Sequence, residues 1–324
     1  MFKFQKDFYK NGQGLHLKTI LYSVLASIIM TIIMLIPGAA FLIGVITMSA
    51  TQNDITGEPS GAGVATFIIS MIIGIILSLV VYIFILIPMA YGMLKYYKDT
   101  DLSRTPRFKD LFMFLKKGNY VKTLKLTLII FVLSVAIYII IYIVVFIVEI
   151  IFFGIFGTSM AIMQPDSSGS NVGVMSISLI ILILFMIVVM LAIFIPIYYI
   201  IIFIANTILV HVDQRSLPTF TKLSIGWNIT SKGPNNAWKL LFSNLLYFII
   251  AYIIFAVLCI ISALIISILP TALQIIFGIF LYIIGFIYMI IISHFVYGSV
   301  VNFYHKNKNA LYPPHNQENE QTNY

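Results

Sequence analysis

The chain has very few charged residues and one cysteine. Only 9% of its 324 residues are charged, where soluble domains carry about 25%, and its mean hydropathy is +1.05. Cys259 has no second cysteine to pair with, which excludes an internal disulfide. With 61% hydrophobic residues, the composition excludes a water-soluble domain and predicts an all-α integral membrane protein.

The motifs that hold metals or nucleotides are also missing. The sequence contains no HExxH, no Cys/His cluster and no GxxxxGK[ST] loop. Ser293 and His294 are neighbours, but no acid lies near them to complete a nucleophilic triad. We therefore expect a protein that is not an enzyme and that carries no cofactor and no metal.

Long apolar runs predict six membrane-spanning helices in a single domain, 1–304. A helix needs about 20 apolar residues to cross the hydrocarbon of a bilayer. The first run is too long for a cleaved signal peptide and is interpreted as a retained anchor, and Pro270 predicts a tight hairpin between the last two spans. The spans are 19–50, 64–94, 126–156, 175–210, 240–269 and 271–304, and a polar tail, 305–324, is expected to be disordered.

The basic residues predict the orientation of the spans. All 19 Lys and Arg residues lie in the two tails and in the second and fourth loops. The charged residues of the first and third loops are all acidic: Asp54, Glu58 and Asp166. Because Lys and Arg mark the cytoplasmic side, both termini are predicted to be cytoplasmic. Heavy use of Ile, Lys and Asn suggests an AT-rich bacterial genome and hence the bacterial cell membrane. The topology accounts for the positive charge, so a nucleic-acid partner is not expected.

The second loop contains a short basic and amphipathic segment, "SRTPRFKDLFMFLKKGNY". Thr105 and Pro106 are typical of a helix start, and Gly118 is typical of a left-handed end. Spacing at i, i+3, i+4 and i+7 predicts one apolar α-helical face. The proposed lipid contacts are Phe108, Leu111, Phe112 and Leu115, with Lys116 and Lys117 beside anionic lipid of the cytoplasmic leaflet. Two alternatives stay open: the apolar face docks on the span ends, or the loop is only a topology signal.

Related patterns recur three times along the chain. Aromatic residues, then a lysine close before Gly12, Gly118 or Gly233, precede the first, third and fifth spans, and "YGMLKYYK" after span two echoes "YGSVVNFYHK" after span six. We interpret this as three copies of an interfacial helix followed by a transmembrane hairpin.

Part of the sequence resembles an uncharacterised bacterial family of polytopic membrane proteins. Residues from about 195 to 304 carry "FIPIYYIIIFIANTILV", "LPTFTKLSIGWNITSKGPNNAWKLLFSNLL" and a last span that ends in "NFYHK". They are similar in plan to the membrane domain attached to some glycerophosphodiester phosphodiesterases. The resemblance implies an all-helical membrane fold and no activity.

A few polar and kink-forming residues lie within the spans. Glu149 is a candidate ion or proton site; the alternative is a glutamate that reaches the outer interface or forms a hydrogen bond inside the bundle. His294 is a candidate proton shuttle, with a neutral, hydrogen-bonded imidazole as the alternative. Pro37, Pro88 and Pro196 are candidate helix kinks.

These observations favour a transport-associated protein, either a small permease or the membrane partner of an exporter or peptide-resistance system. The alternative is a non-transporting scaffold that binds anionic lipid or partner proteins at the inner leaflet, and an intramembrane enzyme is the least favoured. The expected partners are the lipid bilayer and an additional membrane protein or ATPase.

Overall fold

A computed structural model describes the chain except residues 1, 53–57, 163–171, 269 and 314–324. Within that part the regular structure is helical, and six helices are long and apolar enough to cross a membrane. The chain divides into two compact units, Met1–Thr127 with Ile202–Tyr324, and Leu128–Ile201. The predicted all-α polytopic fold is therefore confirmed, while the single domain stays a prediction.

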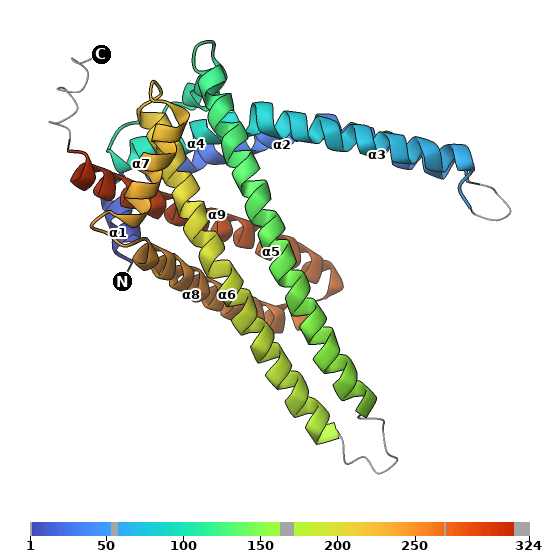
Figure 1. The fold of residues 1–324 in the computed structure, drawn as a ribbon. Coiled ribbons are helices and arrows are strands. Elements are labelled where there is room, and N and C mark those ends of the chain that lie inside the picture. The colour runs from blue at the N-terminus through green and yellow to red at the C-terminus, as the bar shows by residue number, and fades with distance from the viewer. Residues whose placement is uncertain (1, 53–57, 163–171, 269, 314–324) are drawn as a thin grey trace. The chain divides into compact units, whose positions relative to one another are not determined.

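The first unit begins with a short helix and a long hairpin. Its helices are α1 (Lys3–Asn11), α2 (His16–Ala50), α3 (Gly61–Val81) and α4 (Ile87–Asp101). Helices α2 and α3 lie side by side (Figure 1) because small residues let them approach closely. A Cβ atom added at Gly44 would lie 2.8 Å from Ser70, and one at Gly74 would lie 2.8 Å from Phe41.

One turn of π-helix, η1 (Tyr82–Leu86), joins α3 to α4 and directly precedes Pro88. A proline lacks the N–H that would bond to the previous turn, and a wider π turn is a common way to accommodate such a break. Pro37 and Pro196 lie inside α2 and α6 without an interruption of the helix, so kinks at these two positions stay predictions.

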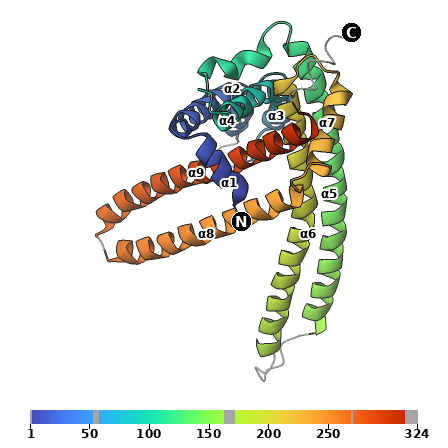
Figure 2. The same ribbon diagram turned by 90° about the vertical axis from the view of Figure 1, so that its left-hand side faces the viewer.

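The middle of the chain forms a second pair of long helices. The elements are η2 (Phe108–Leu115), α5 (Tyr120–Ile162), α6 (Val172–Asp213) and α7 (Thr219–Ser231). Helices α5 and α6 lie beside each other in both ribbon views (Figures 1 and 2). Their central parts make up the second unit, and their basic ends belong to the first.

The last hairpin consists of α8 (Ala237–Ser267) and α9 (Thr271–Leu311), which pair along their lengths (Figure 2). Pro270 stands immediately before α9 in an extended conformation, as the hairpin prediction requires. The prediction of a disordered tail from 305 is wrong at its beginning, because α9 continues to Leu311 and His305 and Asn307 are buried.

The buried core of the first unit lies at the basic ends of the helices, not along the spans. One cluster joins Phe8, Tyr97, Leu209 and Val301, whereas most apolar side chains along the six long helices are exposed. Lipid is the solvent that such exposed apolar surface requires. The structure is thus that of a multi-pass membrane protein whose fixed tertiary packing is concentrated at one end, which we call the polar end.

Candidate functional site

The polar end contains three short segments, and each packs on the second helix of a hairpin. Segments η2 and α7 pack on the hairpin before them in the chain, and α1 packs on the last hairpin. Segment α1 packs on α9, η2 packs on α4, and α7 packs on α6. A Cβ atom at Gly298 would lie 2.1 Å from Phe8, and one at Gly92 would lie 2.4 Å from the Leu111 carbonyl oxygen. Each short segment precedes one hairpin and docks on another, so the three predicted copies form a closed cycle.

The third contact in this cycle has the glycine on the short segment instead. A Cβ atom at Gly226 of α7 would lie 2.2 Å from Thr207 Oγ1 of α6, and Asn206 Nδ2 donates to Thr230 Oγ1 at 2.8 Å. Thr207 therefore occupies the place on α6 that Gly92 and Gly298 occupy on α4 and α9. Each of the three contacts contains one glycine, Gly92, Gly226 or Gly298, because the two elements approach so closely there that no space is left for a methyl group.

A buried aspartate joins the three helices at the centre of the polar end. Asp213 of α6 accepts from Tyr304 Oη at 2.6 Å and from Lys308 Nζ at 2.7 Å, and it pairs with Lys98 of α4. Lys98, Asp213 and Tyr304 each lie six positions after Gly92, Thr207 and Gly298 respectively. Equivalent positions of the three copies thus converge on one ion-pair cluster.

A second buried aspartate ties α1 and α9 to the end of α4. Asp101 Oδ2 lies 2.5 Å from His305 Nδ1, and its Oδ1 accepts from Asn302 Nδ2 at 2.8 Å and from Asn11 Nδ2 at 3.1 Å. Because the Asp101 side chain is buried, these donors replace the water that the carboxylate loses on folding.

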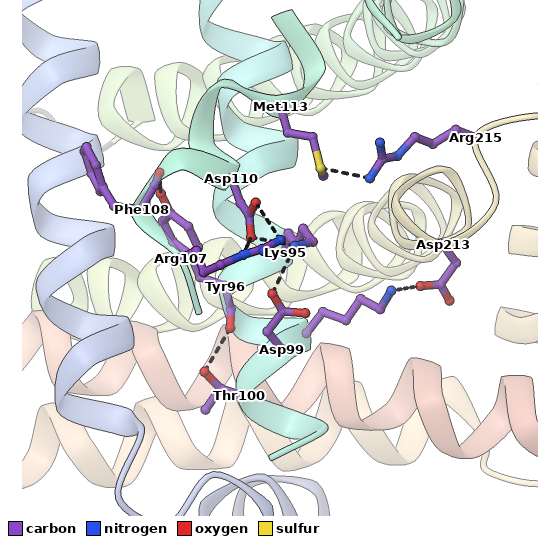
Figure 3. Close-up of polar contacts among 11 residues, drawn as sticks. Lys95, Tyr96, Asp99, Thr100, Arg107, Phe108, Asp110, Met113, Asp213 and Arg215 are labelled. Atoms are coloured by element: carbon purple, nitrogen blue, oxygen red, sulfur yellow. Dashed lines mark hydrogen bonds and ion pairs between the residues drawn. The ribbon is translucent and has the colours of Figure 1, made fainter. Parts of the chain in front are cut away.

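A third aspartate holds η2 on α4 (Figure 3). Lys95 Nζ lies 2.5 Å from Asp110 Oδ2 and 3.2 Å from Asp99 Oδ2, and Arg107 approaches Asp110 at 3.5 Å. Tyr96 Oη also donates to the Phe108 carbonyl oxygen at 2.7 Å. The segment is fixed to the helix by charge as well as by apolar packing.

The structure corrects the prediction for the second loop. Residues Phe108–Leu115 form a 3₁₀-helix that begins after Arg107, not an α-helix that begins at Pro106. A 3₁₀-helix repeats every 3.0 residues, so Leu111 and Phe114 share the buried face and Phe112 is 36% exposed. Leu111 is fully buried, so the prediction that it contacts lipid is wrong. The predicted left-handed conformation of Gly118 is confirmed, with φ 90°.

The remaining candidates in this segment divide between core and surface. Phe108 and Leu115 are partly buried and pack with Leu111 against α2 and α4, which favours the docking alternative for the apolar face. Lys116 and Lys117 are exposed, so contact with anionic lipid stays a prediction for them and for Phe112.

His294 is buried between α1, α2 and α9. Its Nε2 lies 3.0 Å from His16 Nδ1, and His16 Nε2 lies 2.9 Å from the Tyr9 carbonyl oxygen. Because a carbonyl only accepts, His16 carries its proton on Nε2 and accepts from His294. The arrangement agrees with the structural alternative for His294, a hydrogen bond to a neighbouring helix.

Glu149 belongs to the second unit. Its side chain is exposed on α5, and no ion pair among the described residues includes it. His294, the other candidate, belongs to the first unit.

Sequence reasoning missed the aspartates that organise the polar end. Asp99, Asp101, Asp110 and Asp213 were not singled out from the sequence, although an acid that persists inside a strongly basic loop indicates an internal partner. In the part of the chain that is described, no group of three or more His, Cys, Asp or Glu side chains could hold a metal ion. The aspartates of the polar end are therefore partners of basic side chains and not members of a described metal-binding group.

Comparison with family models, with curated proteins and with solved structures finds no match to this chain.

Proposed function

We propose that this protein is a non-catalytic scaffold of the bacterial cell membrane, and that its polar end lies at the cytoplasmic surface and binds anionic lipid. One observation carries the proposal. Every aspartate of the polar end pairs with a basic side chain inside the protein: Asp7 with Lys306, Asp99 and Asp110 with Lys95, Asp101 with His305, and Asp213 with Lys98 and Lys308. The charge left on the exterior is therefore positive.

The exposed lysines lie on α1 and η2, in the connections that follow η2 and α7, and at the starts of α5 and α8. On α1, the aromatic rings of Phe4 and Phe8 are buried against α9, which leaves the lysines on the opposite face. The exposed lysines are Lys3, Lys6, Lys10, Lys109, Lys116, Lys117, Lys122, Lys125, Lys232 and Lys239. Such a basic surface gains about 1 kcal/mol per Lys or Arg near an anionic leaflet.

Exposed aromatic rings accompany the lysines. Tyr9 of α1 is 53% exposed, Phe112 of η2 is 36% exposed, and Phe220 and Trp227 of α7 are 75% and 47% exposed. Rings of this kind are enriched at the level of the lipid headgroups. Their presence on every short segment supports a polar end that rests in the membrane interface and does not project far into water.

A transport-associated role is the second candidate. It rests on Glu149, a carboxylate within a span, and on the proline-containing helices. Ion and proton paths in membranes usually contain several polar groups that face one another, and no ion pair among the described residues includes Glu149. A partner ATPase or exporter component is a proposal that co-purification from the native membrane tests.

The scaffold proposal is tested by lipid selectivity in reconstituted bilayers. The relative association constant of a spin-labelled anionic lipid over a neutral one is measured for the parent protein and for the triple variant Lys109→Gln, Lys116→Gln, Lys117→Gln. We expect the parent to prefer the anionic lipid, and each lost charge to reduce the preference by up to roughly fivefold, since 1 kcal/mol is about that factor.

The matched control replaces the same three lysines by arginine, which keeps the charge, and should leave the preference unchanged. Added salt should weaken the preference of the parent because exposed charges are screened. A parent protein with no preference for the anionic lipid would refute the proposed function.

A further inference from the structure

A group of unneutralised basic side chains lies beside the end of α6, separate from the aspartate clusters. It consists of Lys122 at the start of α5, Arg215 in the connection after α6, and Lys222 of α7. Arg215 and His211 both lie against the Phe114 ring, each 5.4 Å from its centre, and Lys122 adjoins Thr123, whose hydroxyl lies 2.9 Å from His211 Nε2. No ion pair among the described residues includes any of the three lysine and arginine side chains.

Lys222 is the most unusual member of this group. Its side chain is only 1% exposed, and its ammonium group, which has three N–H donors, donates to the Arg215 carbonyl oxygen at 3.1 Å. Lysine is almost never buried to this degree without a carboxylate partner. Burial, and then the charge of Lys122, lower the pKa of Lys222 from 10.5 to about 8.

Arg215 also lacks a carboxylate. Its Nη2 donates to Met113 Sδ at 2.8 Å, and its guanidinium lies 5.4 Å from the centre of the Phe114 ring. A thioether is a weak acceptor and an aromatic face is neutral, so neither cancels the positive charge. Asp213, two residues earlier, does not supply the missing charge, because its carboxylate pairs with Lys98 of α4 and with Lys308 of α9.

His211 contributes an acceptor that has no partner. Its side chain is fully buried, and Nε2 lies 2.9 Å from Thr123 Oγ1. The Thr123 hydroxyl gives its one proton to the Asn119 carbonyl oxygen at 2.9 Å, so His211 Nε2 donates and Nδ1 carries a lone pair. That Nδ1 is buried with no hydrogen-bond partner among the described atoms, which costs free energy unless a ligand supplies a donor.

A ligand that satisfies this group must bring several anionic oxygens and one hydroxyl. The cations require the oxygens, and His211 Nδ1 requires the hydroxyl proton. A singly protonated phosphomonoester, or inorganic phosphate, has both, whereas a phosphodiester has no P–OH group. Lys122 is exposed and Arg215 is partly buried, so a ligand meets these two side chains first, whereas Lys222 and His211 lie buried behind them.

We propose that Lys222, Arg215, Lys122 and His211 form a binding site for a phosphomonoester group, in which Lys222 and Arg215 hold the anionic oxygens and His211 Nδ1 accepts from the protonated oxygen. The phosphate group comes either from a lipid headgroup or from a soluble phosphate. The lipid source deepens the proposed function and rests on it, while the soluble source does not depend on it.

The first experiment titrates the purified full-length protein with inorganic phosphate and follows thermal unfolding and heat of binding. We expect phosphate to bind and to raise the melting temperature, and Lys222→Met to weaken binding by about tenfold to a hundredfold, the range of a lost charged hydrogen bond. The control Lys239→Met removes an exposed lysine of α8 outside the group and should bind phosphate as the parent does.

Protein without phosphate shows whether the variant is folded. Lys222→Met removes an unneutralised buried charge, so it should be as stable as the parent or more stable before phosphate is added. Arg215→Gln gives an independent variant with the same expected loss of binding. Equal responses of the parent and both variants to phosphate would overturn the assignment of the site.

The second experiment distinguishes the source of the phosphate in bilayers of phosphatidic acid or phosphatidylglycerol, which are both anionic but only the first of which has a phosphomonoester. Preference for phosphatidic acid that is lost in Lys222→Met supports the lipid source. Binding of inorganic phosphate without that preference supports the soluble source, and a parent protein that shows neither overturns the proposal. A general preference for anionic over neutral lipid reports on the proposed function alone.

Discussion

The central ion-pair cluster predicts a large loss of stability when Asp213 is replaced by asparagine. The substitution keeps the shape of the side chain and an oxygen that accepts from Tyr304, but removes the only negative charge between Lys98 and Lys308. Two lysine ammonium groups then face each other without a counter-charge. The variant therefore tests the electrostatic role of Asp213 separately from its packing.

The exposed fractions of the three side chains set the magnitude. They are 9% for Asp213, 14% for Lys98 and 16% for Lys308, so all three are largely removed from water. Breaking a buried ion pair by removal of one partner costs about 3–5 kcal/mol. Because some solvent still reaches the lysines, we expect the lower end of that range, about 3 kcal/mol.

The assay is reversible unfolding of the purified protein in mixed micelles, followed by helical signal against denaturing detergent. The double variant Asp213→Asn with Lys98→Met removes one charge of each sign and should recover a large part of the loss. Glu149→Gln, which makes the same chemical change at an exposed acid, should shift stability by less than about 0.5 kcal/mol. If Asp213→Asn is no more destabilising than Glu149→Gln, the reasoning about the cluster is refuted.

Three further substitutions test the packing and the charges of the polar end. Gly298→Ala should destabilise the protein by about 1–3 kcal/mol because its methyl group overlaps a ring of α1, whereas Gly278→Ala on the same helix has open space and should be neutral or stabilising in the same unfolding assay. Leu111→Ala should lower the free energy of unfolding by about 2–5 kcal/mol because it truncates a buried side chain, and Phe112→Ala should lower it by less than about 1 kcal/mol. Equal losses would contradict the docking of this segment on α4 and would favour contact with lipid. The pKa of Lys222 is lowered to about 8 in the folded protein, from 10.5. Between about pH 8 and 10.5 the unfolded chain therefore binds more protons than the folded protein, and the free energy of unfolding should rise with pH. A pH titration of unfolding should show a smaller rise in Lys222→Met, and an identical rise would contradict the assignment.

The spans could be predicted because lipid imposes a simple rule on long apolar helices. The same rule placed the ends of two of these helices, α4 and α9, too early in the chain. Helix α4 continues through Lys95 to Asp101, and α9 continues through His305 to Leu311, although hydropathy falls in both stretches. Partners from distant parts of the chain, such as the pair of Asp101 with His305, keep these ends helical and buried, and no local pattern encodes such partners.

The repeat was visible in the sequence, but its most obvious markers were not the structurally equivalent residues. Gly12 and Gly118 precede hairpins in similar contexts, yet only Gly118 has a positive φ. The echo between "YGMLKYYK" and "YGSVVNFYHK" was the better signal, because its glycines, Gly92 and Gly298, are where η2 and α1 pack closely on α4 and α9. The third copy has Thr207 there, which hides the correspondence from sequence comparison.

The period of the second loop was misjudged for a physical reason. Spacings of three and four residues predict an α-helix, but Leu111 and Phe114 are the buried pair, and Asp110 is drawn inward by Lys95. Tertiary contacts with α4 therefore select the 3₁₀ form over the local pattern. The candidate phosphate site could not be predicted at all, since burial of Lys222 is invisible in a loop that is basic throughout.

The central claim is tested most directly by measuring on which side of the membrane the polar end lies. Cysteines placed singly at Lys117 and at Ser60, in protein with Cys259→Ala, are treated in intact cells with a membrane-impermeant thiol reagent. We predict labelling at position 60 and none at 117 until the membrane is opened. Labelling at 117 from outside intact cells would place the basic surface on the wrong side of the bilayer and contradict the account.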